Sequence, residues 1–292
     1  MKQSIALVLG SGGARGLAHI GVIEEFEKQG FEIKSIAGTS MGALIAGIYA
    51  MDKLQDYKEW SLTLDIVNVF NLIDFTFSSQ GLIKADRVIK KMKTFITDKN
   101  IEDLKIPFAA VATDITNEKE VVFTTGSVYE AVRASIAIPT VFTPVKKDNV
   151  LLVDGGLLNP IPVNRIKRTR NDILVAVNVY ADIPHTKEKK QTKKQLEVQS
   201  FYDKNIKKFK QKLNEIIPKS NKQKLGYFKL LNATTSAMIH QISEMTLDIY
   251  KPDILVNISK HACSTFDFYK AEQLIEIGKL AAKESIEKFK KQ

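Results

Sequence analysis

Three short glycine-bearing motifs, in a fixed order along the chain, hold side chains that can do chemistry together. They are Gly10-Ser11-Gly12-Gly13-Ala14-Arg15-Gly16, then Gly38-Thr39-Ser40-Met41-Gly42, then Asp154-Gly155-Gly156. In that order they offer backbone N–H groups that can bind an anion, a serine hydroxyl and a carboxylate base. Cleavage of an ester by acyl transfer needs these three parts, and no single motif indicates that chemistry alone.

The second motif predicts a serine nucleophile at Ser40. In Gly-x-Ser-x-Gly the serine lies on a sharp turn from a strand to a helix, and the flanking glycines let the two elements approach each other closely. Residues 34–37 predict a short strand and residues 41–51 a buried helix, which is the context the motif requires. The alternative is a tight turn with serine as the helix N-cap.

The loop 10–16 has two functional interpretations. A dinucleotide-binding turn would use Gly10, Gly12 and Gly16, but the last interval is one residue too long, and no acidic residue ends the second predicted strand. An oxyanion hole would use the backbone N–H groups of Gly12, Gly13 and Ala14. Arg15 would then add a nearby cation or brace the loop. A glycine-rich connection without a ligand is the remaining alternative.

Asp154 follows a predicted strand at 150–153 and is the candidate base, although Asp-Gly-Gly is also a common turn sequence. A carboxylate can deprotonate a serine if burial raises its basicity. Of the four histidines, His261 follows the last predicted strand and is the rival base. We expect His19, one turn into the first helix, to pack or hydrogen-bond beside the loop.

The first fifty residues read as strand 4–9, helix 15–29, strand 34–37 and helix 41–51. This alternation predicts a parallel sheet covered by helices. Further strands are predicted at 107–115, 121–124, 150–153, 173–179 and 254–258. Further helices are predicted at 56–73, 84–96, 128–138 and 268–289.

Composition suits one large α/β domain or two small ones, with 292 residues of which 44% are hydrophobic. No apolar run is long enough to span a bilayer, and the N-terminus does not read as a signal peptide. The single cysteine, Cys263, fits a reducing compartment. We therefore expect a cytoplasmic protein.

The net charge of +10 is concentrated in one segment. Residues 184–224 contain thirteen lysines and no arginine against four acidic residues, which is +9 and leaves +1 for the rest of the chain. Apolar residues recur there at three- and four-residue spacing, which predicts a basic amphipathic helix. Such a helix either lies on an anionic membrane surface or packs against a helix at 225–250. The absence of arginine from the segment argues against nucleic acid.

Taken together, the motifs resemble those of the patatin-like phospholipases, in the bacterial branch related to neuropathy target esterase. Gly12-Gly13-Ala14-Arg15-Gly16 matches the family's oxyanion loop, with Ser11 at its first glycine. Residues 38–42 match the nucleophile motif and residues 154–156 the motif of the base. The stretches 17–22 and 134–139 are also similar, and the resemblance covers roughly residues 4–180.

The resemblance implies a three-layer α/β/α fold with a central, mostly parallel sheet. It implies a catalytic dyad of Ser40 and Asp154, and an oxyanion hole formed by Gly12, Gly13, Ala14 and Arg15, without metal or cofactor. It implies hydrolysis of lipid acyl esters of phospholipids or lysophospholipids. We expect a single domain over 1–292 with a Lys-rich helical insertion at about 184–250. Its helix at 187–222 is expected to contact an anionic membrane peripherally. The alternative function is a membrane-surface adaptor without turnover.

Overall fold

The computed structural model describes residues 3–72, 74–78, 81–84, 86–139, 141–184 and 223–291. The chain divides into one compact unit of Met1–Pro184 with Ile239–Gln292 and a second unit of His185–Met238. The first unit carries all three motifs. Of the second, the structure describes only residues 223–238, which belong to helix α8 (Gln223–Tyr250). The predicted insertion at about 184–250 overlaps this second unit.

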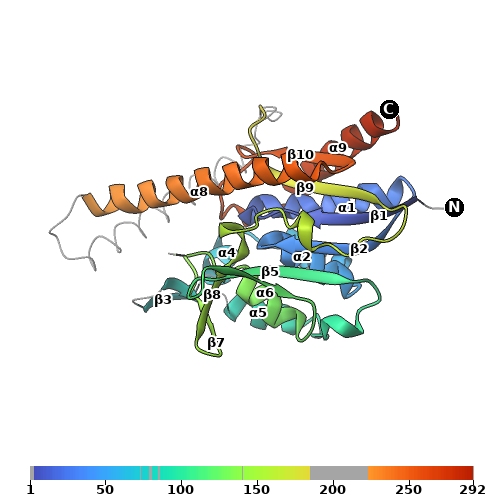
Figure 1. The fold of residues 1–292 in the computed structure, drawn as a ribbon. Helices are drawn as coiled ribbons and strands as arrows, with labels where there is room; N and C mark the ends of the chain where they lie inside the picture. The colour runs from blue at the N-terminus through green and yellow to red at the C-terminus, as the bar shows by residue number, and fades with distance from the viewer. Residues whose placement is uncertain are drawn as a thin grey trace. The chain divides into compact units, whose positions relative to one another are not determined.

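In the described part of the first unit, eight strands form one sheet (Figure 1). The strand order is β10-β9-β1-β2-β5-β8-β7, with β6 paired to β5. Strands β10, β9, β1, β2 and β5 run parallel, whereas β6, β7 and β8 add antiparallel pairings. The strands are β1 (Gln3–Leu9), β2 (Phe31–Thr39), β5 (Phe108–Asp114), β6 (Lys119–Phe123), β7 (Val145–Lys147), β8 (Val150–Asp154), β9 (Ile173–Ala181) and β10 (Ile254–Ser259).

Helices cover the sheet because its central strands are apolar on both faces. Every residue from Ile5 to Leu9 of β1 is fully buried, as expected for an interior parallel strand. On one face the core joins β1, β9 and β10 to helices α1, α2, α6 and α9. On the other face Ala6 and Val8 pack with Ile161 and with Leu247 of α8. The helices of the first layer are α1 (Ala18–Lys28), α2 (Met41–Ala50), α6 (Val128–Ser135) and α9 (Ala271–Phe289).

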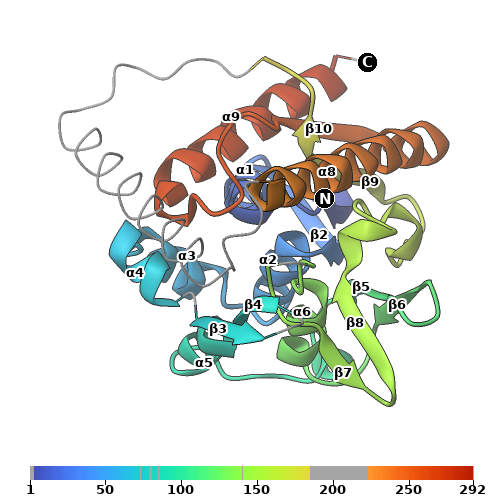
Figure 2. The same cartoon turned by 90° about the vertical axis from the view of Figure 1, so that its left-hand side faces the viewer.

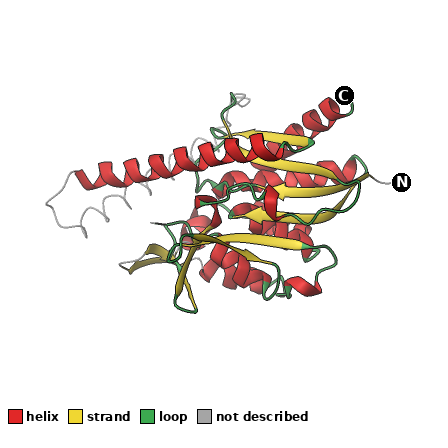
Figure 3. Ribbon diagram, in the orientation of Figure 1, coloured by secondary structure: helices red, strands yellow, loops and turns green. Residues whose placement is uncertain are grey.

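These layers confirm the predicted α/β/α fold with a mostly parallel central sheet (Figure 3). Helices α1 and α9, from opposite ends of the chain, pack directly against each other (Figure 2). The other helices and strands described between α2 and β5 are α3 (Leu54–Leu62), α4 (Ile66–Leu72), the hairpin of β3 (Asp74–Ser78) and β4 (Gly81–Lys84), and α5 (Asp86–Lys93).

The structure corrects three predicted elements. The helix expected over 56–73 is two helices, because Thr63 turns back to the carbonyl oxygen of Trp60 and the Asp65 carboxylate accepts the N–H of Asn68 to start α4. The helix expected over 15–29 begins as a 3₁₀ segment at Gly13–Leu17. The helix expected over 84–96 begins only at Asp86, because Gly81–Lys84 form β4, which pairs with β3.

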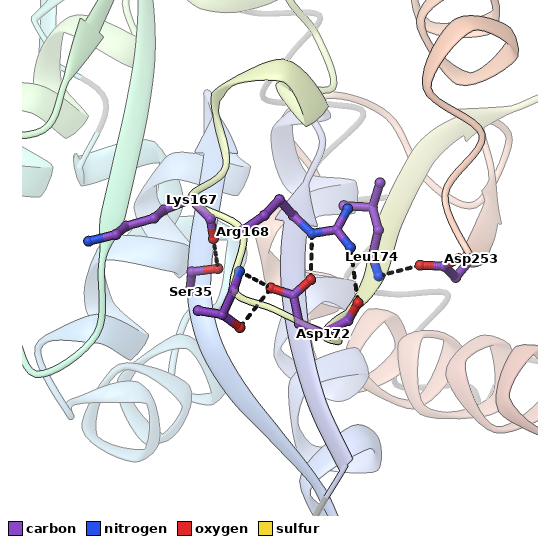
Figure 4. Close-up of polar contacts among 7 residues, drawn as sticks. Ser35, Lys167, Arg168, Asp172, Leu174 and Asp253 are labelled. Atoms are coloured by element: carbon purple, nitrogen blue, oxygen red, sulfur yellow. Dashed lines mark hydrogen bonds and ion pairs between the residues drawn. The ribbon is translucent and has the colours of Figure 1, made fainter.

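A polar cluster lies at the amino ends of β9 and β10 (Figure 4). The carboxylate of Asp172, whose side chain is fully buried, accepts hydrogen bonds from Arg168 Nε and from the N–H of Thr169, each at 2.5 Å. Burial alone would raise the pKa of this carboxyl, but these hydrogen bonds outweigh it and hold the pKa below its ordinary value. The cluster thereby anchors the chain just before β9.

Candidate active site

The turn between β2 and α2 places Ser40 in a backbone conformation that residues with a side chain rarely adopt. Its φ is 57° and its ψ is −125°, a strained region that costs of order 1–3 kcal/mol and persists only where the surroundings enforce it. A Cβ on Gly42 would collide with the carbonyl oxygen of Leu9, so glycine is needed for α2 to begin this close to β1. This sharp turn is the geometry that the Gly-x-Ser-x-Gly motif predicts.

Ser40 and Asp154 meet although 114 residues separate them. The Ser40 hydroxyl donates to Asp154 Oδ2 at 2.5 Å, and the N–H of Gly156 donates to Asp154 Oδ1 at 2.7 Å. Strand β5 explains the meeting, because Thr39 of β2 pairs with Val111 and Asp154 of β8 pairs with the next residue of β5. A serine hydroxyl and a carboxylate are therefore in direct contact at the edge where β2 ends.

Burial makes Asp154 a stronger base than an ordinary aspartate. Its residue is 5% exposed and Ser40 is 2% exposed. Desolvation raises the pKa of Asp154 to about 6, and the hydrogen bonds from Ser40 and Gly156 lower it by less. A carboxylate that holds its proton more tightly accepts the serine proton more readily, while remaining ionised at neutral pH.

The loop 10–16 lies at the end of β1, and two of the four predicted oxyanion groups have hydrogen-bond partners elsewhere in the fold. The N–H of Ala14 donates to the carbonyl oxygen of Thr265 at 2.9 Å, so it is already engaged. Among the described residues no partner is found for the N–H groups of Gly12 and Gly13. These two remain the candidate oxyanion donors of the predicted set.

The Arg15 side chain braces the loop against the segment after β10. Its guanidinium donates to the carbonyl oxygens of Cys263 at 3.1 Å and Lys260 at 3.3 Å, and it stacks 4.5 Å from the ring centre of Tyr180. The cation therefore holds the segment after β10 against the loop. Of the two roles expected for Arg15, the structure shows the bracing one.

His19 lies where the sequence predicted it, beside the loop and without a place in the dyad. Its Nε2 is 2.8 Å from the carbonyl oxygen of Gly10, which can only accept, so Nε2 carries the proton. The residue is fully buried, and this desolvation lowers its pKa to about 4. His19 is thus neutral at physiological pH and fixes the start of the loop.

His261, the rival base, lies outside the site. Its side chain is 63% exposed, and its Nε2 is 3.8 Å from Asp182 Oδ1. We expect His261→Ala to keep its rate of ester hydrolysis within about twofold of wild type, because removing an exposed side chain that does not touch the reacting atoms leaves the transition state unchanged. The steady-state rate of fatty-acid release is the measurement. A loss comparable to that of Asp154→Asn would make the histidine the base and overturn the dyad.

Ser135 had no predicted role, and the structure places it against Ser40. The backbone N–H of Ser40 donates to Ser135 Oγ at 2.8 Å. The signal available in the sequence was the stretch 134–139, which matched the family without an assigned purpose. No periodicity or charge pattern connects it to Ser40.

In the described part of the chain, no group of three or more His, Cys, Asp or Glu side chains is placed to hold a metal ion. Over the same residues, no helix combines the length and the apolar character needed to cross a membrane.

The fold and site define an α/β protein with a serine on a strand-to-helix turn and an aspartate as its hydrogen-bond partner.

Comparison with known proteins identifies the family to which this chain belongs. The model of the patatin-like phospholipases matches residues 7–165, which include all three motifs. The chain belongs to the patatin-like phospholipase family, as its motifs predicted, and its general chemistry is lipid acyl hydrolysis.

The relatives differ in how much of their length aligns with this chain. An uncharacterized NTE family protein of Mycobacterium tuberculosis is 30% identical, with 98% of this chain and 92% of the relative aligned. Human patatin-like phospholipase domain-containing protein 6 is 33% identical over 61% of this chain and 13% of its own length. Among solved structures, VipD from Legionella pneumophila has a TM-score of 0.47 at 11% identity, covering 99% of this chain and 67% of that one.

Proposed function

We propose that this protein is a serine acyl hydrolase that cleaves fatty-acyl esters of phospholipids or lysophospholipids through a dyad of Ser40 and Asp154. The observation that carries the proposal is the buried 2.5 Å hydrogen bond between Ser40 Oγ and Asp154 Oδ2, at a strained turn. A strained backbone and a buried, unneutralised carboxylate both cost stability, and such costs concentrate at functional sites.

The first half-reaction forms an acyl-enzyme. Asp154 takes the hydroxyl proton as Ser40 Oγ attacks the ester carbonyl carbon, giving a tetrahedral intermediate. The N–H groups of Gly12 and Gly13 donate to its oxyanion, assisted by the positive end of α2. The ester C–O bond then breaks, and the proton on Asp154 passes to the alcohol that leaves.

The second half-reaction restores the enzyme. Water attacks the acyl carbonyl and gives a proton to Asp154, which returns it to Ser40 Oγ as the bond between serine and acyl group breaks. The products are the alcohol fragment and a free fatty acid. No redox partner or metal is required for the atoms to balance.

A fluorophosphonate probe tests the proposal, because it reacts only with activated serines. We expect labelling of the wild-type protein and none of Ser40→Ala, and Ser61→Ala is a matched control because Ser61 is fully buried in α3. Since Ser40 is 2% exposed, both measurements are made with and without phospholipid vesicles. Absence of labelling under both conditions, in folded wild-type protein, would instead favour the membrane-surface adaptor.

We further propose that the Lys-rich segment 187–222 holds the protein at an anionic membrane surface from the cytoplasm. This segment lies outside the described residues, and the support is its charge, since each lysine near an anionic surface contributes about 1 kcal/mol. We expect deletion of 187–222 to weaken binding to phosphatidylglycerol vesicles at least about tenfold. A second variant keeps the full length and removes only charge. It replaces five lysines by glutamine: Lys204, Lys207, Lys208, Lys210 and Lys212. Unchanged sedimentation of both variants with vesicles would contradict a membrane role.

A further inference from the structure

The last residue of α6 and the residues that follow it contact the backbone of both Ser40 and Asp154. Ser135 is the last residue of α6, and Ala137 follows two positions later. We propose that Ser135 is a positioning residue, whose hydroxyl fixes the backbone of the nucleophile while the neighbouring Ala137 carbonyl fixes the backbone of the base. This inference rests on the proposed function of the Ser40–Asp154 pair.

The Ser135 hydroxyl makes two hydrogen bonds within the site. It accepts the N–H of Ser40 at 2.8 Å and donates to the carbonyl oxygen of Val111 at 2.6 Å. Ser135 itself is fully buried, so no water replaces either partner. The one hydroxyl therefore ties the nucleophile turn to β5, the strand that lies between β2 and β8.

The base is held by the same short segment. The backbone N–H of Asp154 donates to the carbonyl oxygen of Ala137 at 2.9 Å. A Cβ on Gly155 would collide with the carbonyl oxygen of Val111, so the chain after Asp154 passes directly over the atom that Ser135 binds. Val111 is thus the point where the supports of the two catalytic residues meet.

Two consequences follow for the chemistry. First, the N–H of Ser40 is committed to Ser135 and does not serve the oxyanion. Second, without the hydroxyl this N–H would be left buried and unpaired at a backbone conformation that is already strained, so the turn would relax. A shift of about 1 Å in the attacking oxygen is enough to lower a rate about 100-fold.

The variant Ser135→Ala tests the proposal, with Ser61→Ala as the matched control. Both serines are fully buried, and Ser61 Oγ also donates to a backbone carbonyl, that of Lys58, at 2.8 Å in α3. We expect Ser135→Ala to lower kcat about 10- to 100-fold with KM within about twofold, and Ser61→Ala to change neither. The pH below which kcat/KM falls, expected near the Asp154 pKa of about 6, is expected not to shift in Ser135→Ala, because Ser135 makes no hydrogen bond to the carboxylate of Asp154.

Amide hydrogen exchange gives a readout that needs no turnover. The Ser40 amide is expected to be protected in the wild-type protein and to lose at least about tenfold in protection in Ser135→Ala, while the Asp154 amide keeps its protection. If Ser135→Ala does not fold, amide hydrogen exchange in the wild-type protein still tests the proposal, because an unprotected Ser40 amide would overturn it. A kcat within twofold of wild type overturns it as well. Failure of the fluorophosphonate test with a protected Ser40 amide would reject the enzymatic function and leave the backbone role standing.

Discussion

Replacing Ser40 by alanine is expected to lower the rate of phospholipid or lysophospholipid ester hydrolysis by at least about 10⁴-fold. The reason is that the attacking atom is lost, and the remaining oxyanion donors and substrate binding accelerate the reaction only weakly. Release of fatty acid from defined vesicles or micelles is the measurement, with the enzyme concentration high enough to detect the residual rate.

The alanine variant is expected to fold as well as the wild type. Removing one hydroxyl leaves Asp154 with its second hydrogen bond, from the N–H of Gly156, and leaves the backbone of the turn held by Ser135. We therefore expect the midpoint of thermal unfolding to change by only a few degrees. Residual turnover above about 1% of wild type in a folded variant would show that another group is the nucleophile.

Replacing Asp154 by asparagine is expected to lower the same rate by at least about 10³-fold. An amide can hydrogen-bond to the Ser40 hydroxyl and to the N–H of Gly156, but it cannot accept a proton. The substitution therefore separates the basicity of the carboxylate from its role in packing. The control is His261→Ala, which removes the rival base; activity retained in Asp154→Asn would exclude the dyad.

The same substitution is expected to increase stability at pH 8. Burial raises the pKa of Asp154 from 3.8 in the unfolded chain to about 6 in the folded one. Between those values the folded state binds more protons, so the stability of the wild type falls as pH rises from about 4 to 6, by up to about 3 kcal/mol. Asparagine does not ionise, so the variant does not lose this stability. In urea unfolding we expect Asp154→Asn to have a higher free energy of unfolding than the wild type at pH 8, and no such difference near pH 4.

The pH dependence of kcat/KM in the wild type also depends on the ionisation of Asp154. Because the base must be ionised, we expect the rate to fall about tenfold for each pH unit below the Asp154 pKa of about 6, and to be level above it. An acid limb near pH 4 would instead indicate an ordinary, solvated carboxylate.

Much of the fold was predictable because its information is local. The continuous apolar run of β1, the Gly-x-Ser-x-Gly turn and the buried helix α2 are each determined by neighbouring residues, and their order implies a parallel sheet. Where local signals were weak, the prediction was wrong. The break between α3 and α4 depends on the capping carboxylate of Asp65, which lies within an otherwise helical pattern.

Which side chains carry the candidate chemistry was also predictable, since Ser40 and Asp154 stand in motifs that can be read without the fold. What the sequence by itself determined is therefore most strands of the central sheet, the helices that cover it, and Ser40 and Asp154 as the candidate pair. It determined the concentration of positive charge in 184–224 as well. Each of these depends on residue types within a short window of the chain.

Only the tertiary structure decided how those groups are held. The N–H of Ala14 and the guanidinium of Arg15 are engaged by carbonyl oxygens about 250 positions later in the chain, and the N–H of Ser40 is engaged by Ser135, 95 positions away. Hydrogen-bond partners at such separations are selected by which strands pair and which loops meet, and every serine or carbonyl in the chain has the same capacity to bond. The physical reason is that residue type determines what a group can do, whereas the packed fold determines which groups remain free to do it.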